Sequence, residues 1–107
     1  MTPAWLRPRA EADLIDKTRY YRTAGGDRLG ERCFDAALAS LRSVERMPGI
    51  GSALMGEICD IAGLRSWPIK GFPIRWYYFV TDDHLDVVRL LADAQDLPAL
   101  LSGVSDP

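Results

Sequence analysis

The chain has little histidine, little cysteine and no long apolar run. Its 107 residues contain one histidine and two cysteines, Cys33 and Cys59, which stand alone rather than in Cys-x-x-Cys pairs. This pattern excludes a disulfide framework and a two-armed zinc site, so we expect both thiols to be reduced. No uncharged apolar segment approaches the roughly 20 residues that cross a bilayer, and the first residues lack the apolar stretch of a signal peptide. These absences predict a cytoplasmic protein that does not enter a membrane.

Side chains that carry chemistry are correspondingly few. His84 follows a Thr-Asp-Asp sequence that is typical of a hairpin loop, and no serine or cysteine has a context that pairs it with this histidine. Asp82, Asp83 and Asp86 fit a polar hairpin better than a metal site. We therefore name no catalytic residue and expect no metal and no cofactor.

The charge of the chain is slightly negative and unevenly spread. The net charge is -2, from 13 basic and 15 acidic residues. Residues 1–50 carry nine basic and seven acidic side chains, whereas residues 51–107 carry four and eight. A large basic face is not expected, which disfavours general nucleic-acid binding. Eleven of the 13 cations are arginine, which pairs with carboxylates at interfaces as well as with phosphates, so an acidic partner is favoured.

What is present is an ordinary globular composition. With 48% hydrophobic and 26% charged residues in 11.9 kDa, the chain has the size and composition of one domain. We expect that domain to comprise residues 1–101 and residues 102–107 to form a flexible C-terminal tail.

The first half of the chain predicts a helical hairpin. A first helix is expected from Pro8 to about Ala24, because Pro fits the first helical turn and the following glycines can end a helix. Asp27 is then placed to cap a second helix, which should stop at Pro48. Two helices joined this closely must be antiparallel. The apolar stripe of the second helix consists of Leu29, Cys33, Phe34, Ala37, Leu38, Leu41 and Val44.

The second half predicts strands. The hydrophobic period changes to two in residues 64–69, 72–80 and 85–92, and the short turns between these segments make neighbouring strands antiparallel. Residues 2–7 give a weak signal for a further edge strand between two prolines. Residues 53–62 suggest a short third helix or an ordered loop. The fold class is therefore α+β, with a helical hairpin packed on a small, mainly antiparallel sheet.

Both faces of the predicted sheet are apolar, so both must be covered. On the side away from the helical hairpin, strict alternation places Tyr77, Phe79, Val87 and Leu91. A partner protein is the natural way to complete this second core. The alternative is that residues 53–62 and the C-terminal segment cover the face by themselves.

The order and spacing of several short motifs resemble the RelE/ParE superfamily of bacterial toxins. The resemblance extends over residues 4–101 and has two departures. Residues 53–62 are longer than the usual link, and residues 92–95 replace a more basic sequence with one that includes Asp93. The segments that match ParE-like toxins are Ala12-Asp13-Leu14 with Tyr20-Tyr21, Met47-Pro48-Gly49-Ile50-Gly51, Leu64-Arg65, residues 71–78, residues 87–91 and residues 94–101.

The resemblance implies a β-α-α-β-β-β fold and the toxin of a type II toxin–antitoxin module. ParE-like members bind DNA gyrase and trap its cleaved DNA complex, which requires no catalytic constellation. RelE-like members are metal-independent, ribosome-dependent mRNA endonucleases, which need proton-transfer and phosphate-binding groups. Here Pro73 matches the third-strand arginine of RelE, and no Arg, Lys, His or Tyr follows Arg89. We therefore expect a gyrase inhibitor, with an endonuclease or a non-toxic antitoxin-binding protein as alternatives.

All three interpretations imply a cognate antitoxin that forms a hetero-oligomer with this chain. An acidic amphipathic segment would need apolar anchors flanked by cations. Gyrase-contacting residues cannot be assigned from a motif, and no sequence-specific nucleic-acid binding is expected. The residues expected to bind the antitoxin are Arg65, Trp67, Arg75, Tyr77, Phe79, Arg89 and Leu91.

Overall fold

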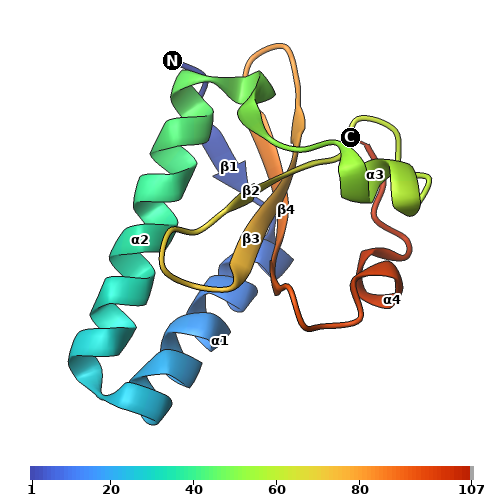
Figure 1. The fold of residues 1–107 in the computed structure, drawn as a ribbon. Coiled ribbons are helices and arrows are strands. Elements are labelled where there is room, and N and C mark those ends of the chain that lie inside the picture. The colour runs from blue at the N-terminus through green and yellow to red at the C-terminus, as the bar shows by residue number, and fades with distance from the viewer. Residues whose placement is uncertain (107) are drawn as a thin grey trace.

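The structure, a computed structural model, describes residues 1–106. Two long helices lie on one side of a four-stranded sheet, and two short helices lie on the other side (Figure 1). This arrangement confirms the expected α+β fold and its β-α-α-β-β-β order, to which three short helices are added. The elements are β1 (Ala4–Leu6), α1 (Pro8–Gly25), α2 (Asp27–Arg46), η1 (Pro48–Ile50), α3 (Leu54–Ile58), β2 (Arg65–Pro68), β3 (Ile74–Val80), β4 (Leu85–Ala92) and α4 (Leu97–Leu101).

Helices α1 and α2 form the antiparallel hairpin that the sequence predicts. Gly26 ends α1 with a φ of 91°, a conformation that favours glycine, and its N–H donates to the Arg22 carbonyl at 2.8 Å. Gly26 also precedes the first residue of α2, so Asp27 lies inside that helix and does not cap it as the sequence suggested. Asp27 still lies in the first turn of α2, where the helix dipole favours a negative charge.

The strand order is β1-β4-β3-β2. β1 is parallel to β4, whereas β2, β3 and β4 are antiparallel neighbours, so the sheet is mainly antiparallel as expected. Helix α2 protects the outer edge of β1. The N–H of Thr2 donates to the Glu45 carbonyl at 3.0 Å, and the N–H of Ala4 donates to the Glu45 carboxylate at 2.8 Å.

A β-bulge in β4 changes which side chains share a face. Tyr77 pairs with Arg89 and Tyr78 pairs with Val87, so Val88 has no partner on β3. The extra residue shifts the alternation by one position. Val87 therefore lies in the core beneath the hairpin, and Val88 lies in the core on the opposite face. The placement of Val87 on the opposite face was wrong.

The core beneath the hairpin holds the largest buried side chain. Trp76 is 0% exposed, and its indole N–H donates to the Ala37 carbonyl at 2.9 Å. The Tyr78 hydroxyl donates to the Pro48 carbonyl and accepts from the Gly51 N–H, which fixes the turn after α2. A Cβ at Gly51 would overlap that hydroxyl, so the position requires glycine. The other buried members include Ala10, Leu14, Cys33, Leu41, Val44, Ile69, Ile74, Leu85, Val87 and Leu90.

The opposite face of the sheet is covered by the chain itself. Tyr77, Phe79 and Leu91 are each 1% exposed. Helices α3 and α4 lie over them (Figure 1). The expectation that a partner completes this core is wrong, because each short helix turns several apolar side chains toward the sheet. The residues that cover it are Met55, Cys59, Ile61, Leu97, Leu100, Leu101 and Val104.

Packing continues beyond Leu101 into the segment that we expected to be a tail. The Val104 N–H donates to the Leu101 carbonyl at 3.0 Å, and the Ser105 carbonyl accepts from Arg7 Nη2 at 2.9 Å. Pro107, the last residue of the expected tail, lies outside the described residues. Within residues 1–106, no helix has the length and apolar character needed to cross a membrane.

Candidate functional site

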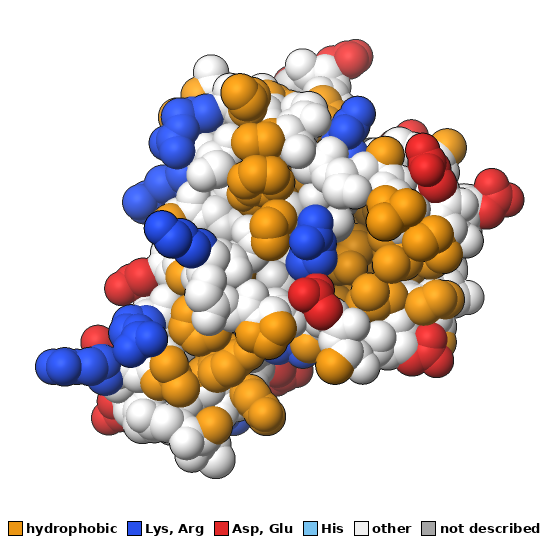
Figure 2. Space-filling model, viewed as in Figure 1, with side chains coloured by type: hydrophobic (Ala, Val, Ile, Leu, Met, Phe, Trp, Pro, Cys, Tyr) orange, Lys and Arg blue, Asp and Glu red, His pale blue; other side chains and the backbone are white. Residues whose placement is uncertain are grey.

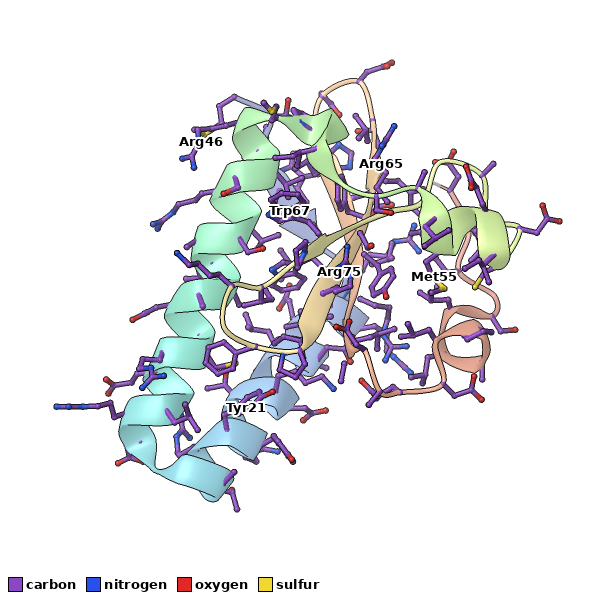
Figure 3. The ribbon with its side chains drawn as sticks, in the orientation of Figure 1. Tyr21, Arg46, Met55, Arg65, Trp67 and Arg75 are labelled. Atoms are coloured by element: carbon purple, nitrogen blue, oxygen red, sulfur yellow. The ribbon has the colours of Figure 1, made fainter. Side chains whose placement is uncertain are left out.

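Three of the predicted site residues lie around the edge strand β2. Arg65, Trp67 and Arg75 are half-buried. Trp67 pairs with Trp76 and therefore lies on the hairpin side of the sheet, whereas Arg75 donates from Nε to Ser66 Oγ at 3.1 Å on the other side. Figure 3 shows the three side chains around β2, with Trp67 on the side of α2. The structure thus brings them to one edge of the molecule but to different faces of the sheet.

A groove of about 550 Å³ runs between α2 and β2. Trp67 and Pro68 form its sheet side, and Lys70 lies at its border. Hydrophobic side chains gather on this face of the molecule, and Lys and Arg side chains border them (Figure 2). None of the described residues that line the groove is acidic. The small residues that form its helical wall are Ala36, Ala39, Ser40 and Ser43.

The outward-facing backbone groups of β2 already have hydrogen-bond partners within the chain. The N–H and the carbonyl of Ser66 both bond to Ser52, at 2.9 and 2.8 Å. Pro68 has no N–H, and its carbonyl accepts from the Ser40 hydroxyl at 3.0 Å. A strand of another protein would find few free backbone groups here. The groove therefore favours a partner that inserts side chains over one that extends the sheet.

Four predicted site residues are inside the molecule. Tyr77, Phe79 and Leu91 belong to the core under α3 and α4, and Arg89 is 8% exposed. The apolar surface that these residues were expected to present is therefore absent, because the chain covers it. Burial also raises the pKa of the Tyr77 hydroxyl, a shift that nearby Arg75 partly opposes.

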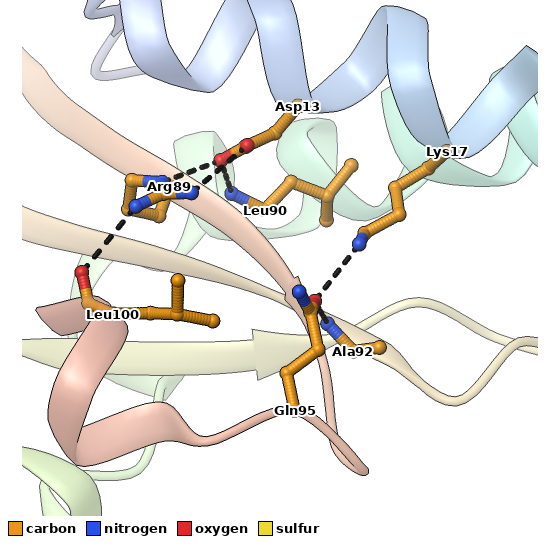
Figure 4. Close-up of polar contacts among 7 residues, drawn as sticks. All are labelled: Asp13, Lys17, Arg89, Leu90, Ala92, Gln95 and Leu100. Atoms are coloured by element: carbon orange, nitrogen blue, oxygen red, sulfur yellow. Dashed lines mark hydrogen bonds and ion pairs between the residues drawn. The ribbon is translucent and has the colours of Figure 1, made fainter.

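Arg89 of β4 forms an ion pair with Asp13 of α1 and also contacts α4. Its Nε and Nη2 donate to the Asp13 carboxylate at 2.7 and 3.1 Å, and its Nη1 reaches the Leu100 carbonyl of α4 at 3.3 Å (Figure 4). Asp13 also accepts the Leu90 N–H at 3.0 Å, beyond the point where β1 stops pairing with β4. Asp13 therefore accepts a hydrogen bond from a backbone N–H of β4 that β1 does not reach.

The segment that departs from the family pattern has a structural role. Gln95 Oε1 accepts from Lys17 Nζ at 2.8 Å and from the Ala92 N–H at 2.7 Å (Figure 4). Lys17 lies one helical turn after Asp13, so the same face of α1 holds both the end of β4 and the loop that leads to α4. Residues 92–95 thus form a fixed connection between β4 and α4.

The arginines that a phosphate-cleaving site could use do not converge. Arg65 Nη1 donates to the carbonyls of Gly49 and Gly51, at 3.3 and 2.7 Å. Arg75 bonds to Ser66, and Arg89 is paired with Asp13. Each guanidinium stabilises a different part of its own chain.

A second groove, which the sequence reasoning missed, lies between α1 and α2. Ile15 is 57% exposed and Phe34 is 40% exposed in this groove, although Phe34 belongs to the apolar stripe predicted for the second helix. The charged residues along it are of both signs, Arg19 and Arg22 against Glu31 and Asp35. Helical periodicity identifies an apolar stripe but not where its margin meets solvent.

The aromatic residue Trp5 of β1 lies on the surface. The residue is 56% exposed, and its ring stacks on that of His84 with the ring centroids 4.0 Å apart. His84 Nδ1 is 2.7 Å from the Asp83 carboxylate, and this contact lowers the pKa of Asp83. The two rings and the hairpin loop form a fixed local cluster.

Comparison with known proteins agrees with the resemblance. Residues 6–97 match the family model described as the ParE toxin of the type II toxin–antitoxin system parDE. A solved structure described as the chromosomal ParDE TA system from P. aeruginosa is similar to 86% of this chain and 96% of its own chain, with a TM-score of 0.73 and 15% identity. No curated protein sequence matches significantly. The family match spans most of the chain, and the chain therefore belongs to the ParE toxin family of type II toxin–antitoxin systems.

Proposed function

We propose that this chain inhibits DNA gyrase in the cytoplasm by trapping the cleaved gyrase–DNA complex, and that a cognate antitoxin neutralises it. Family membership supports the toxin role. We choose gyrase over the ribosome as the target because the arginines that an endonuclease could use lie apart from one another. Arg65, Arg75 and Arg89 contact separate parts of the chain and form no joint phosphate site. A toxin that acts by surface complementarity needs no such site.

The test is a gyrase supercoiling assay in which the cleaved DNA products are resolved. The expected result is accumulation of linear or nicked DNA with the free chain, and its suppression by an equimolar amount of the antitoxin. A folded chain that leaves both supercoiling and cleavage unchanged would contradict gyrase as the target. Cleavage of translated messages in a parallel ribosome assay would favour the endonuclease alternative.

We propose the groove between α2 and β2 as the place where the antitoxin docks. Trp67 supplies an aromatic anchor, the small residues of α2 leave room beside it, and Lys70 borders it. Arg65 lies nearby on β2, on the same face of the sheet as Trp67, whereas Arg75 lies on the opposite face. These features fit an acidic segment with apolar side chains. The α1–α2 groove fits such a segment less well, because Glu31 and Asp35 offset the attraction of Arg19 and Arg22.

Two alanine variants separate the two grooves. Trp67→Ala should weaken antitoxin binding by about 30-fold or more, the loss that accompanies removal of an aromatic anchor. Phe34→Ala removes an aromatic side chain from the other groove and should leave the affinity within a few-fold of wild type. Isothermal titration with the antitoxin measures both, and circular dichroism confirms that each variant is folded. The reverse pattern would move the docking site to the α1–α2 groove.

A further inference from the structure

The groove between α1 and α2 has one basic wall and one acidic wall. Arg19 and Arg22 line it from α1, whereas Glu31 and Asp35 line it from α2. All four residues are exposed, and the groove has a volume of about 500 Å³. Within the groove, the two signs of charge are therefore sorted by helix.

The two walls do not neutralise each other within the chain. Among residues 1–106, no ion pair joins one wall to the other. The contacts that Arg19 and Arg22 do make, with Asp16 and Asp27, are long at 3.7 and 3.8 Å. Neither residue of the acidic wall takes part in an ion pair in the described part of the chain. The charges of both walls are therefore available to another molecule.

The register of the hairpin places opposite charges at the same level. A Cβ at Gly30 would lie 3.0 Å from the Cβ of Arg22 and 3.3 Å from the carbonyl oxygen of Thr18, so Gly30 is level with the turn of α1 between these two residues. Because α1 and α2 are antiparallel, Glu31 is then level with Arg19. The basic wall and the acidic wall therefore cover the same stretch of the hairpin.

Charged residues beyond the groove extend this arrangement. Glu11 on α1 and Arg42 on α2 lie within one helical turn of the same level in this register. Arg28 is an exception, because it is level with Arg22. It lies in the first turn of α2, at the end of the hairpin. Opposite signs therefore predominate at matching levels of the two helices.

Two exposed apolar side chains lie between the walls. Ile15 is 57% exposed and Phe34 is 40% exposed. Protein interfaces place apolar anchors at their centre and charged side chains at their rim. A segment of one sign, such as an acidic antitoxin segment, would match only one wall. A second copy of this chain can match both.

From these observations we infer that the α1–α2 groove is the interface of a two-fold symmetric dimer of this chain. A two-fold axis parallel to the two helices places α1 of one copy over α2 of the other copy, at the same level. Arg19 of each copy then faces Glu31 of the other copy, and Ile15 and Phe34 of both copies meet at the centre. Because both copies use the same surface, each ion pair occurs twice.

The size of the hairpin predicts a weak dimer. The 18 residues of α1 span about 27 Å, and two helices side by side are about 20 Å wide. Contact over this whole face covers about 500 Å² on each copy, or about 1,000 Å² in total, which is near the lower limit for a specific interface. We expect a dissociation constant on the order of 10 μM. The α2–β2 groove lies on the other side of α2, so the dimer leaves that groove open.

Sedimentation velocity of the full chain without antitoxin, from about 1 to about 300 μM, measures this self-association. The expected result is a concentration-dependent increase from 11.9 kDa to twice this mass. Arg19→Glu should weaken the dimer by about tenfold or more, because both copies of the ion pair become repulsive, and Glu31→Arg should do the same. A wild-type chain that stays monomeric over the whole range would overturn the inference.

A mixture of the two charge-reversal variants tests the two-fold geometry. In a mixed dimer, the two changed side chains face each other with opposite charge, and the unchanged Glu31 of one variant faces the unchanged Arg19 of the other. The equimolar mixture should therefore dimerise within a few-fold of wild type, although each variant alone does not. Arg9→Glu makes the same change of charge on α1 outside the groove and should leave the dimer intact.

Circular dichroism establishes that each variant is folded. Self-association that survives both single reversals would place the interface elsewhere and overturn the inference. A mixture of folded variants that stays monomeric would contradict the two-fold arrangement and overturn it as well.

Discussion

The two faces of the sheet are covered in different ways. The hairpin face lies under α1 and α2, of 18 and 20 residues, which bury one continuous apolar core. The other face lies under α3 and α4, of five residues each, and under the residues that follow α4. Isolated helices this short are not stable, so α3 and α4 depend on the sheet beneath them. The hairpin face is thus stabilised by long helices, and the second face by a few local contacts.

Polar contacts compensate for the thin cover on the second face. Arg7 pairs with Asp86 through two hydrogen bonds and also reaches Ser105, which holds the C-terminal segment. The hydrogen bond with Asp86 raises the pKa of Arg7, so this cation stays charged. Arg89 connects Asp13 on α1 to α4. The same hairpin that covers one face therefore helps to hold the cover on the other.

Breaking the link between the faces should have the largest effect. Asp13→Ala leaves the Arg89 guanidinium buried without its carboxylate, which should lower the free energy of unfolding by about 3–5 kcal/mol. Urea denaturation measures this change. Asp16→Ala removes an exposed carboxylate paired with Arg19 at 3.7 Å and should cost less than about 0.5 kcal/mol. Similar losses for the two variants would show that the Asp13 pair has no special role.

Two adjacent leucines compare the packing of the faces directly. Leu90 lies under the hairpin and Leu91 under α3 and α4, with exposures of 0% and 1%. Leucine-to-alanine changes in cores cost about 2–5 kcal/mol, and the cost falls where neighbours can move into the space. Leu90→Ala should lie near the upper end and Leu91→Ala near the lower end in urea denaturation. Equal losses would mean that both covers are equally rigid.

Two adjacent tyrosines separate hydrogen bonding from burial. Tyr78→Phe removes the bonds to Pro48 and Gly51 and should lower the free energy of unfolding by about 1–3 kcal/mol. Tyr77→Phe removes a hydroxyl that makes no side-chain hydrogen bond within residues 1–106, and should change it by less than about 0.5 kcal/mol. Thermal melting of both variants checks the difference. A larger loss for Tyr77→Phe would contradict it.

The smallest expected effect is a loss of stability in alkali. Burial raises the pKa of both Tyr77 and Tyr78, so the unfolded chain loses these protons at lower pH than the folded chain. Their contribution is complete below about pH 10 and is lost as pH rises through the folded-state pKa, by at most about 1.4 kcal/mol per pH unit for each tyrosine. Tyr77→Phe should make this decline shallower. Chemical denaturation between pH 8 and 11 measures it, and an unchanged slope would contradict the assignment.

The sequence predicted those parts of the fold that depend on local signals. The glycines after α1, Pro48 after α2 and the alternation in residues 85–92 each mark a boundary that neighbouring residues determine. The bulge at Val88 could not be predicted, because it depends on how β4 pairs with β3. A single missed bulge is enough to reverse the face assigned to Val87.

For a related reason, the sequence did not reveal which of the seven expected antitoxin-binding residues are accessible and which are buried. Arg65, Trp67 and Arg75, which were chosen as an apolar anchor flanked by cations, are half-buried and lie around the edge strand β2. Tyr77 and Leu91 would have the same sequence pattern if a partner covered them or if the chain itself covered them. That choice depends on where α3 and α4 pack, and no local pattern encodes it.

Hydrogen exchange of the free chain tests the central claim, that the chain covers both faces of its sheet without a partner. The account predicts that backbone amides of β3 and β4 exchange slowly in the isolated protein, and that those of α4 exchange faster than those of α2 but measurably slower than in a peptide of the same sequence. Addition of the antitoxin should protect α2 and β2 and leave α4 unchanged. Unprotected α3 and α4 in the free chain that become protected only with the antitoxin would contradict the account.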